Sequence, residues 1–428
     1  MKIAMFTDAY FPRINGVAIS VKSYAQELTK LGHQVCVVCL EYSEEQQKSA
    51  LFDSKSEDEK SPFKIIRVPS TYLIFSKEDR AARFDKWTFV KKQMKLFKPD
   101  VIHINSEWVI GYFGAMFARN YHVPYVFTFH TLWEDYLANY MHILPKSGCQ
   151  KLGRDVVKFY LKRADEIIAP TRRIEQVVSD YKVDRPVDLL PTGIPEELFN
   201  FSLPRFRQIQ RKLFSKFPQL KGKKVLLYVG RVVKEKNLAF LLDVLKETLK
   251  TNPNTALLFV GGGPYLDELA ELAEQMGLAQ NTAFAGYAAR EDLIYFYKCG
   301  SIFVFPSLTE TQGLVTIEAM MAGLPVVAIG ERGTLDVMQG DNGGFMVKND
   351  LQEFSAKVSA LLNDENLFRQ KAAEGEKWSK QWSIKELTPK LVEFYQKAID
   401  CKQAELKKIS DEKNRTAAAE KPDPEKAQ

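Results

Sequence analysis

Short apolar runs alternate with longer segments of helical periodicity along this chain, and the alternation occurs twice. This pattern is typical of parallel sheets whose faces are covered by helices. The apolar runs are residues 2–7, 34–40, 64–69, 101–105, 125–129, 166–169 and 187–191 in the first half, and residues 224–229, 256–260, 282–286, 301–306 and 325–329 in the second. The sequence therefore predicts an α/β protein with two Rossmann-like, doubly wound domains.

The 428 residues are enough for two well-buried cores. We expect an N-terminal domain over residues 1–195, a basic linker over 196–222 and a C-terminal domain over 223–384. Residues 402–428 are rich in Lys, Glu, Ala and Pro with almost nothing apolar, so we expect a disordered charged tail there. The net charge of +6 is too small to argue for a nucleic-acid partner.

The cysteines and the apolar runs bear on the cellular compartment. Five scattered cysteines fit a reducing environment better than a disulfide framework. Cys36 and Cys39 have CxxC spacing, but they lie in a strand-like apolar run, which favours core packing. No run of eighteen apolar residues occurs in the sequence. We expect a cytoplasmic protein that associates peripherally with the inner face of the cell membrane.

Two carboxylates, Glu310 and Glu318, are eight residues apart around the start of an expected helix. Glu310 precedes a glycine in a loop, and Glu318 falls inside the apolar, helix-competent run that follows. The amides of Gly313, Leu314 and Val315 would lie in the first turn, where a helix presents N–H donors to an anion. The motif predicts a phosphate site flanked by groups that can hold hydroxyls.

Other candidate ligands follow expected strands, where doubly wound sheets bind their ligands. Arg231 and Lys236 together can grip a diphosphate, although a solvated basic loop has the same composition. Gly263, in a triple glycine, and Gly16, at a helix start, permit close backbone approach to a ligand, although a tight turn would also use glycine. Tyr287 follows another strand and is either a site residue or a surface aromatic.

These residues together resemble the family 4 glycosyltransferases, which are retaining enzymes of the GT-B fold that use nucleotide sugars. The resemblance covers roughly residues 1–400 and is most specific in the two glutamates preceded by Gly-Arg and Lys. It implies two domains facing a cleft, with residues 385–401 packing back on the first. It also implies that His130 and Glu310 are the catalytic residues beside the donor sugar. Glu318 would hold the ribose, and Arg231 and Lys236 the diphosphate.

The resemblance implies no cofactor besides the nucleotide-sugar substrate and no catalytic metal. The chain has no Asp-x-Asp motif, the usual mark of metal-dependent sugar transferases. Arg231, Lys236 and the helix amides would instead stabilise the leaving diphosphate. The chain departs from the family pattern at Asn15, where many relatives have the first glycine of a Gly-Gly pair.

A second resemblance, to bacterial diacylglycerol glycosyltransferases, is carried by residues 7–12, 15–17 and 130–136. It implies transfer of a hexose, expected to be glucose from a UDP-linked donor, to a membrane lipid such as diacylglycerol. The acceptor would contact residues that follow His130: Trp133, Glu134, Asp135 and Tyr136.

Residues 80–98 offer a means of reaching an anionic membrane surface. Their apolar residues recur at helical spacing among basic ones, which is typical of an interfacial helix but also of a helix packed on its own sheet. Residues 80–163 hold fourteen Lys or Arg against six Asp or Glu, so positive charge is concentrated in the first domain.

Several alternatives fit the same residues. The acceptor could be phosphatidylinositol, a polysaccharide or a soluble sugar. The same architecture also serves nucleotide-sugar 2-epimerases, and a non-catalytic protein that binds sugar nucleotides or lipid surfaces is a third class. The donor sugar, the linkage position and the oligomeric state are left open by the sequence.

Overall fold

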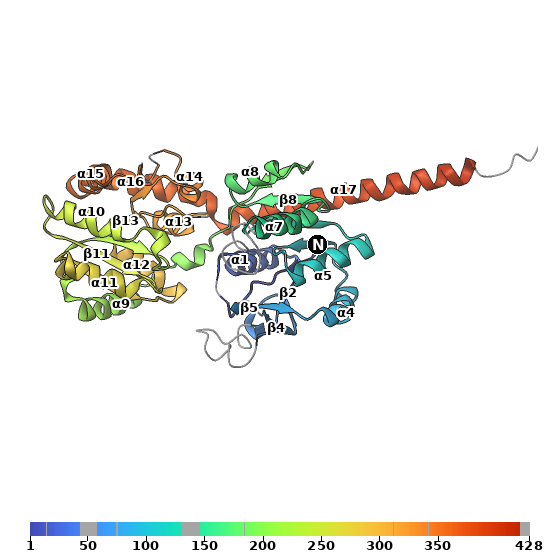
Figure 1. The fold of residues 1–428 in the computed structure, drawn as a ribbon, viewed down its shortest axis with the longest axis horizontal. Coiled ribbons are helices and arrows are strands. Elements are labelled where there is room, and N and C mark those ends of the chain that lie inside the picture. Colours follow the sequence, from blue (N-terminus) through green and yellow to red (C-terminus); the bar gives the residue numbers. More distant parts are fainter. Residues whose placement is uncertain are drawn as a thin grey trace, which may run out of the picture. The chain divides into compact units, whose positions relative to one another are not determined.

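The computed structural model describes residues 1–13, 15–42, 58–73, 76–130, 146–183, 185–310, 312–340 and 342–419. The chain forms two compact units (Figure 1): unit 1 comprises Met1–Leu190 and Thr388–Gln428, and unit 2 comprises Pro191–Leu387. Each unit contains a parallel sheet covered by helices. The two Rossmann-like domains predicted from the alternating apolar runs are therefore present.

The sheet of unit 1 has seven parallel strands in the order β3, β2, β1, β6, β7, β8, β9. Their bounds are β1 (Lys2–Phe6), β2 (Gln34–Leu40), β3 (Lys64–Val68), β6 (Val101–Ile104), β7 (Tyr125–Thr128), β8 (Glu166–Ala169) and β9 (Val187–Leu189). Strands β6, β7 and β8 are buried throughout because helices cover both faces, which is why they read as continuous apolar runs. Cys36 and Cys39 are buried in β2, and burial raises the pKa of both thiols to about 12, as core packing predicts.

The helices of unit 1 are α1 (Gly16–Lys30), α4 (Trp87–Phe97), α5 (Val109–Tyr121), α7 (Lys146–Leu161) and α8 (Arg172–Asp180). A small antiparallel hairpin of β4 (Ser70–Leu73) and β5 (Ser76–Ala82) precedes the short 3-10 turn Phe84–Lys86. Helix α5 packs closely on the sheet, because a Cβ at Gly114 would lie 2.9 Å from the ring of Phe6.

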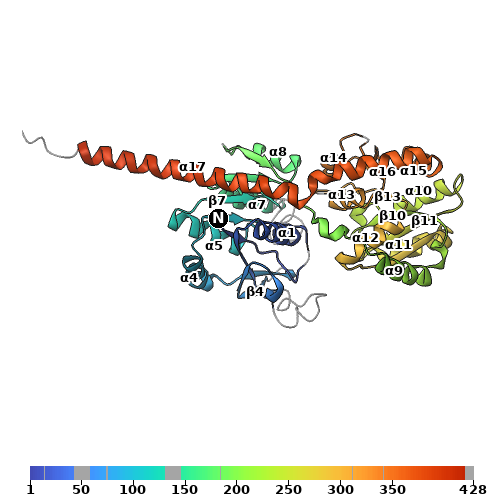
Figure 2. The same ribbon diagram turned by 180° about the vertical axis from the view of Figure 1, so that it is seen from behind.

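Helix α17 (Ile384–Ala419) begins in unit 2 and continues along unit 1 beside α7 and β8 (Figures 1 and 2). Tyr395 lies 2.7 Å from the buried His103, and Lys397 pairs with Glu166 and Asp188. The expectation of a disordered tail from residue 402 is wrong as far as Ala419, because the helix continues to that residue. Lys, Glu and Ala are strong helix formers, so low hydrophobicity did not prevent helix formation.

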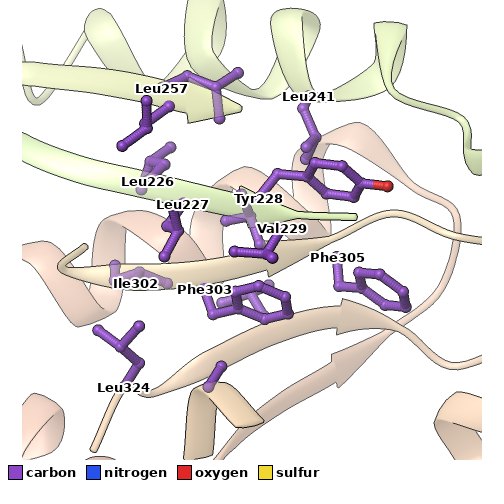
Figure 3. Close-up of a cluster of buried hydrophobic side chains, with 14 of the residues drawn as sticks. Leu226, Leu227, Tyr228, Val229, Leu241, Leu257, Ile302, Phe303, Phe305 and Leu324 are labelled. Carbon is purple, nitrogen blue, oxygen red and sulfur yellow. The ribbon is translucent and has the colours of Figure 1, made fainter. Parts of the chain in front are cut away.

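The sheet of unit 2 has six parallel strands in the order β12, β11, β10, β13, β14, β15. Their bounds are β10 (Lys224–Val229), β11 (Thr255–Val260), β12 (Thr282–Gly286), β13 (Ile302–Phe305), β14 (Val326–Ile329) and β15 (Gly344–Val347). Side chains of β10 and β13 alternate between the faces and pack with α10 (Ala239–Leu249) in a continuous core (Figure 3). Strand β15 is absent from the runs predicted by the sequence.

The other helices of unit 2 are α9 (Leu203–Lys216), α11 (Leu266–Gln275), α12 (Leu293–Cys299), α13 (Leu314–Met321), α14 (Gly333–Val337), α15 (Leu351–Asn363) and α16 (Glu365–Ser379). The 3-10 turns of this unit are Glu196–Phe199, Pro218–Leu220, Lys234–Lys236, Ala279–Asn281, Arg290–Asp292 and Lys380–Trp382.

The prediction that residues 196–222 form a linker is wrong, because these residues belong to unit 2. Helix α9 buries Ile209 and Leu213 in the same core as the sheet. Arg205 also pairs with Asp292 at 2.8 Å. The basic residues that suggested a linker lie on the exposed side of an amphipathic helix, whose apolar side is packed.

Candidate active site

The loops that follow β10 and β13 meet at the carboxyl edge of the unit 2 sheet. Strand β10 lies between β11 and β13, so the strand order reverses there, which is where open α/β sheets bind ligands. Hydrogen bonds join the described residues of these loops, besides the ion pair described next. The hydroxyl of Thr309 donates to the carbonyl of Glu235 at 3.2 Å, and Asn237 Nδ2 donates to the carbonyl of Pro306 at 3.3 Å.

Lys236 and Glu310 form an ion pair across these two loops, with Lys236 Nζ 2.9 Å from Glu310 Oε2. The two side chains are 11% and 20% exposed, so the pair is largely shielded from water but open on one side. Held in this way, the ammonium can bind an anion and the carboxylate can accept a hydrogen bond from a hydroxyl beside that anion. The structure therefore brings together two of the residues selected from the sequence.

Arg231 is more exposed than Lys236 and does not join that ion pair. Its side chain is 72% exposed and lies 3.2 Å from Glu235. Its backbone is better fixed, because the buried Tyr228 donates its hydroxyl to the Arg231 carbonyl at 3.0 Å. A Cβ at Gly230, where φ is +153°, would lie 2.8 Å from that hydroxyl, so this position requires glycine.

The triple glycine after β11 has a packing role within unit 2. A Cβ at Gly261 would lie 1.8 Å from the carbonyl oxygen of Gly230, and one at Gly263 would lie 2.2 Å from that of Val232. Val232 also donates its N–H to the carbonyl of Gly262 at 2.9 Å. The close backbone approach predicted at Gly263 is therefore made to the neighbouring loop of the same unit.

Helix α13 starts as the sequence predicts. Gly313 precedes it with φ of +68°, a left-handed conformation, and its Cβ position faces the carbonyl oxygen of Gly333 at 3.3 Å. Leu314 and Val315 form the first turn, whose N–H groups cannot bond within the helix. Gly333 donates its N–H to the carbonyl of Glu310 at 3.0 Å, which ties the loop before the helix to α14.

Glu318 lies inside α13 with a side chain that is 6% exposed. Each of its carboxylate oxygens has a partner from elsewhere in the chain. Arg290 donates to Oε1 at 3.2 Å, and the hydroxyl of Tyr297 donates to Oε2 at 3.0 Å. Because both partners are donors, the buried carboxylate is compensated and fixed in orientation.

Tyr287 lies at the carboxyl end of β12, beside the loop that follows β11, since Gly261 donates its N–H to the carbonyl of Gly286 at 2.8 Å. It follows β12, the edge strand, and its side chain is 62% exposed. Its place among the donor-binding residues stays a prediction.

In unit 1, three loops follow neighbouring strands at the carboxyl edge of the sheet: that of Gly16 after β1, that of Asn105 after β6 and that of His130 after β7. Gly16 is the first residue of α1 and has no atom within 4 Å of its Cβ position. Asn15 caps this helix, since its Oδ1 accepts the N–H of Ala18 at 2.8 Å. The departure from glycine at residue 15 therefore contributes a helix cap.

His130 Nε2 lies 3.2 Å from the side-chain oxygen of Asn105. An amide oxygen only accepts, so this nitrogen carries the proton and Nδ1 is the acceptor. Burial lowers the pKa of His130 to about 4, so the ring is neutral near neutral pH. Burial, together with the nearby His130, lowers the pKa of His103 to about 3. His103 lies 2.7 Å from Thr128 Oγ1 and 2.7 Å from the hydroxyl of Tyr395.

The proposed acceptor residues Trp133, Glu134, Asp135 and Tyr136 lie outside the described residues, as does Thr311. Within residues 80–98 the helix begins only at Trp87, so a helix over the whole segment is wrong. Arg80 instead belongs to β5, where it donates to the carbonyl of Ser70 at 2.9 Å. Val90 and Met94 are fully buried, and they account for the apolar periodicity.

Exposed apolar and basic residues remain on the other side of this segment. Phe84 and Leu96 are each 67% exposed and Phe89 is 38% exposed, and Arg83, Lys92 and Lys95 are exposed among them. We call these six residues the basic apolar surface.

Sequence reasoning missed Arg290, Tyr297, Tyr228 and Asn105. Asn105 is the last residue of an expected strand and Arg290 lies a few residues after another, positions that could have drawn attention to them. Tyr297 and Tyr228 lie in apolar runs, where a tyrosine gives no sign of a polar contact.

Two further searches covered the described part of the chain. Among those residues, no group of three or more His, Cys, Asp or Glu side chains is placed to hold a metal ion. None of the described helices is both long enough and apolar enough to cross a membrane.

The two Rossmann-like units and the residues after β10 and β13 define the chain as a glycosyltransferase with the GT-B architecture. Residues 14–198 match the family described as Glycosyltransferase Family 4, and residues 209–378 match Glycosyl transferases group 1. The chain is 33% identical over 336 residues to an alpha-monoglucosyldiacylglycerol synthase of Streptococcus pneumoniae, covering 77% of this chain and 71% of that protein. It is 30% identical over 357 residues to the enzyme of the same name from Acholeplasma laidlawii, covering 82% and 86% of the two chains.

The chain therefore belongs to the family 4 glycosyltransferases. A solved structure, that of Anabaena Alr3699/HepE in complex with UDP, has the same fold, with a TM-score of 0.71 over 92% of this chain and 99% of the other at 16% identity.

Proposed function

We propose that this glycosyltransferase moves glucose from UDP-glucose to diacylglycerol with retention of the anomeric configuration. The observation that carries the donor half of this proposal is the ion pair of Lys236 and Glu310 where the strand order of unit 2 reverses. It offers one positive and one negative group side by side, which matches a diphosphate joined to a sugar. The UDP held by the Anabaena protein of the same fold supports the choice of nucleotide.

In this proposal the diphosphate lies between Lys236, Arg231 and the first-turn amides of α13. Breaking the bond between sugar and phosphate builds negative charge on the leaving group, and fixed donors stabilise that charge without rearrangement. Glu310 holds hydroxyls of the donor sugar and Glu318 those of the ribose. Because donors from the protein stabilise the negative charge on the leaving diphosphate, no divalent metal is assigned to the reaction.

Retention follows in this proposal from attack by the acceptor hydroxyl on the same face from which the diphosphate leaves. Glu310 is assigned to the sugar hydroxyls, so it is not the nucleophile of a double displacement. From unit 1, the neutral His130 is the residue that we propose contacts the donor sugar.

The acceptor half of the proposal is supported by the two relatives that match most of the chain, both named as synthases of alpha-monoglucosyldiacylglycerol. A glucose that is α-linked in the nucleotide donor gives an α-linked product only if the configuration is kept. The names of these relatives are therefore consistent with both the lipid acceptor and retention.

A diacylglycerol acceptor is embedded in a membrane, so the enzyme must reach the lipid surface. We propose that the basic apolar surface of unit 1 contacts the inner face of the cell membrane. Its exposed rings and Leu96 can enter the interface while Lys92 and Lys95 face anionic headgroups, since Arg83 is already paired with Asp85 at 3.0 Å. Each basic residue near such a leaflet contributes about 1 kcal/mol.

The experiment that tests the proposal offers radiolabelled UDP-glucose, UDP-galactose and GDP-mannose to the full-length protein with anionic liposomes that contain diacylglycerol. We expect label from UDP-glucose in the lipid extract, as the α-anomer, in buffer with EDTA. Matched liposomes without diacylglycerol, or with phosphatidylinositol in its place, are the controls.

Each other outcome overturns a stated part of the proposal. Label found only in water-soluble product would contradict the lipid acceptor. A new nucleotide sugar formed from the donor alone would mean an epimerase. Loss of transfer in EDTA that is restored by a divalent cation would contradict metal independence.

A further inference from the structure

The carboxylate of Glu318 is held by residues from two other segments of unit 2. Arg290 comes from the 3-10 turn after β12, and Tyr297 comes from α12. Arg290 Nη2 lies 3.2 Å from Oε1 and Tyr297 Oη lies 3.0 Å from Oε2, so each partner addresses a different oxygen. The orientation of the carboxylate is thereby fixed through both of its oxygens.

Tyr297 makes a second contact that reaches the start of the same helix. Its hydroxyl also lies 3.4 Å from the carbonyl oxygen of Val315, in the first turn of α13. The ring is 1% exposed and packs at 6.0 Å from Phe303 of β13. One buried hydroxyl therefore lies beside both the first turn of α13 and the carboxylate one turn further along.

Burial and the adjacent Glu318 raise the pKa of Tyr297 well above its ordinary value. The hydroxyl consequently stays protonated under all assay conditions and remains a donor. A carboxylate oxygen has two lone pairs, so each oxygen of Glu318 can accept a further hydrogen bond from a ligand.

Arg290 has a different consequence from Tyr297, because it carries charge. The first turn of α13 and Glu318 are separated by about 6 Å along the helix, from the rise per residue. A nucleoside diphosphate at that first turn would be repelled by a buried, uncompensated carboxylate at this distance. The guanidinium of Arg290, which is 3.2 Å from the carboxylate and 29% exposed, offsets that negative charge.

We propose that Tyr297 and Arg290 are positioning residues for nucleotide recognition: Tyr297 orients Glu318 toward the ribose hydroxyls, and Arg290 offsets its charge beside the diphosphate. The inference rests on the proposed function, because it takes Glu318 as the ribose ligand. Neither residue contacts the nucleotide itself in this proposal; both act by holding the carboxylate of Glu318.

The test compares UDP with 2′,3′-dideoxy-UDP by calorimetric titration of the full-length protein. The ribose hydroxyls of UDP can hydrogen-bond the charged Glu318 and the dideoxy analogue has none, so we expect the wild type to bind UDP about 100-fold more tightly than the analogue. Tyr297→Phe removes only the hydroxyl, and we expect it to reduce that ratio to below about tenfold. Donor KM should rise with kcat nearly unchanged, since ribose binding is the same in the ground and transition states.

Tyr295→Phe is the matched control, because Tyr295 is also buried on α12 but packs on Phe201 with ring centroids 6.0 Å apart. We expect it to keep the wild-type ratio. Arg290→Gln should weaken UDP about tenfold and uridine much less, because uridine carries no charge to be repelled. Arg290→Lys should restore most of the UDP affinity.

The possible failures are distinguishable. If the wild type binds UDP with the expected ratio and Tyr297→Phe leaves the ratio unchanged, the inference is wrong and the proposed function stands. If the wild type binds another nucleoside diphosphate instead of UDP, the proposed donor is wrong, and the same ratio with that nucleotide and its dideoxy analogue decides the inference. If it binds UDP but does not distinguish the analogue, Glu318 is not the ribose ligand, so the inference is wrong and the proposed donor stands. If it binds no nucleoside diphosphate, the inference and the proposed donor are both overturned.

Discussion

Nζ of Lys236 lies 2.9 Å from Oε2 of Glu310, although the two residues are 74 positions apart in the sequence. They meet because β10 and β13 are neighbours and their following loops share one edge of the sheet. The pair places Lys236, the residue expected to bind the diphosphate, directly beside Glu310, the residue expected to bind the donor sugar.

Replacing Lys236 by Ala should lower kcat/KM for the nucleotide-sugar donor by about 100-fold, the cost of removing one fixed donor from a developing anion. Initial rates with labelled donor measure the effect. Lys234→Ala is the matched control, since Lys234 lies in the same 3-10 turn but is 69% exposed and pairs with Glu268. Equal losses in the two variants would contradict the assignment of Lys236 to the diphosphate.

Replacing Glu310 by Gln should affect contacts with the donor sugar and leave contacts with the nucleotide intact. The proposed role concerns only sugar hydroxyls, so we expect kcat to fall by about 100-fold while the affinity for UDP, which has no sugar attached, does not weaken. Steady-state rates and calorimetric titration of UDP on the same preparation give the two quantities. A variant that loses UDP affinity and keeps kcat would instead place Glu310 at the nucleotide.

Because His130 is neutral, the pH profile of the reaction should lack the inflection that an ordinary histidine would give. Because burial lowers its pKa to about 4, it stays uncharged from about pH 5 upward. We therefore expect kcat/KM to show no inflection near 6.5, the ordinary histidine value. An inflection there that disappears in His130→Gln would show that the ring titrates during catalysis.

His103 should make unit 1 less stable on acidification. Its pKa of about 3 in the folded state lies below the 6.5 of an unperturbed histidine, so between these values the unfolded chain binds a proton that the folded chain does not. Stability therefore falls as pH falls through this window, and is unaffected by His103 above it.

The measurement is the thermal midpoint of wild type and His103→Gln from about pH 7.5 to about pH 5. We expect the wild type to lose more on acidification than the variant, whatever their difference at neutral pH. Other groups of the unit titrate in both proteins, so their contribution cancels in the comparison. Parallel pH curves would show that the pKa of His103 is the same in the folded and the unfolded chain.

The basic apolar surface should govern binding to anionic vesicles. Replacing Leu96, which is 67% exposed, by Ser removes apolar area that would enter the interface, so vesicle co-sedimentation should weaken several-fold. Leu31→Ser is the control, since Leu31 is 49% exposed and lies outside α4. Rates on a detergent-solubilised acceptor should stay unchanged in both. Equal vesicle binding by the two variants would contradict the proposal that this surface contacts the membrane.

Much of the fold could be predicted because parallel sheets covered on both faces need continuous apolar strands. The strands expected at residues 224–229 and 256–260 differ from β10 and β11 by at most one residue. The predictions failed where burial depends on the partner. Helix α9 looks like a basic linker until Ile209 and Leu213 are seen in the core. Strand β15 begins with Gly344, and glycine is uncommon in strands, so it is recognised only by its pairing with β14.

The same distinction applies to the candidate site. Glu310, Glu318 and Lys236 could be selected because polar groups after strands or around a helix start have few structural reasons to be there. Tyr297 could not be selected, since a tyrosine in an apolar helix usually packs in a core. Its contact with Glu318 depends on the packing of α12 against α13.

The sequence by itself determined that the chain forms two parallel sheets with the candidate site loops at their carboxyl edges, because the period of its apolar residues is local and is set by the geometry of strands and helices. It also determined the helix start at Gly313 between the two glutamates. The tertiary structure alone decided which loops meet. Strand order placed Lys236 on Glu310 and helix packing placed Arg290 and Tyr297 on Glu318, because contacts between distant segments arise only when the sheet and its helices are assembled.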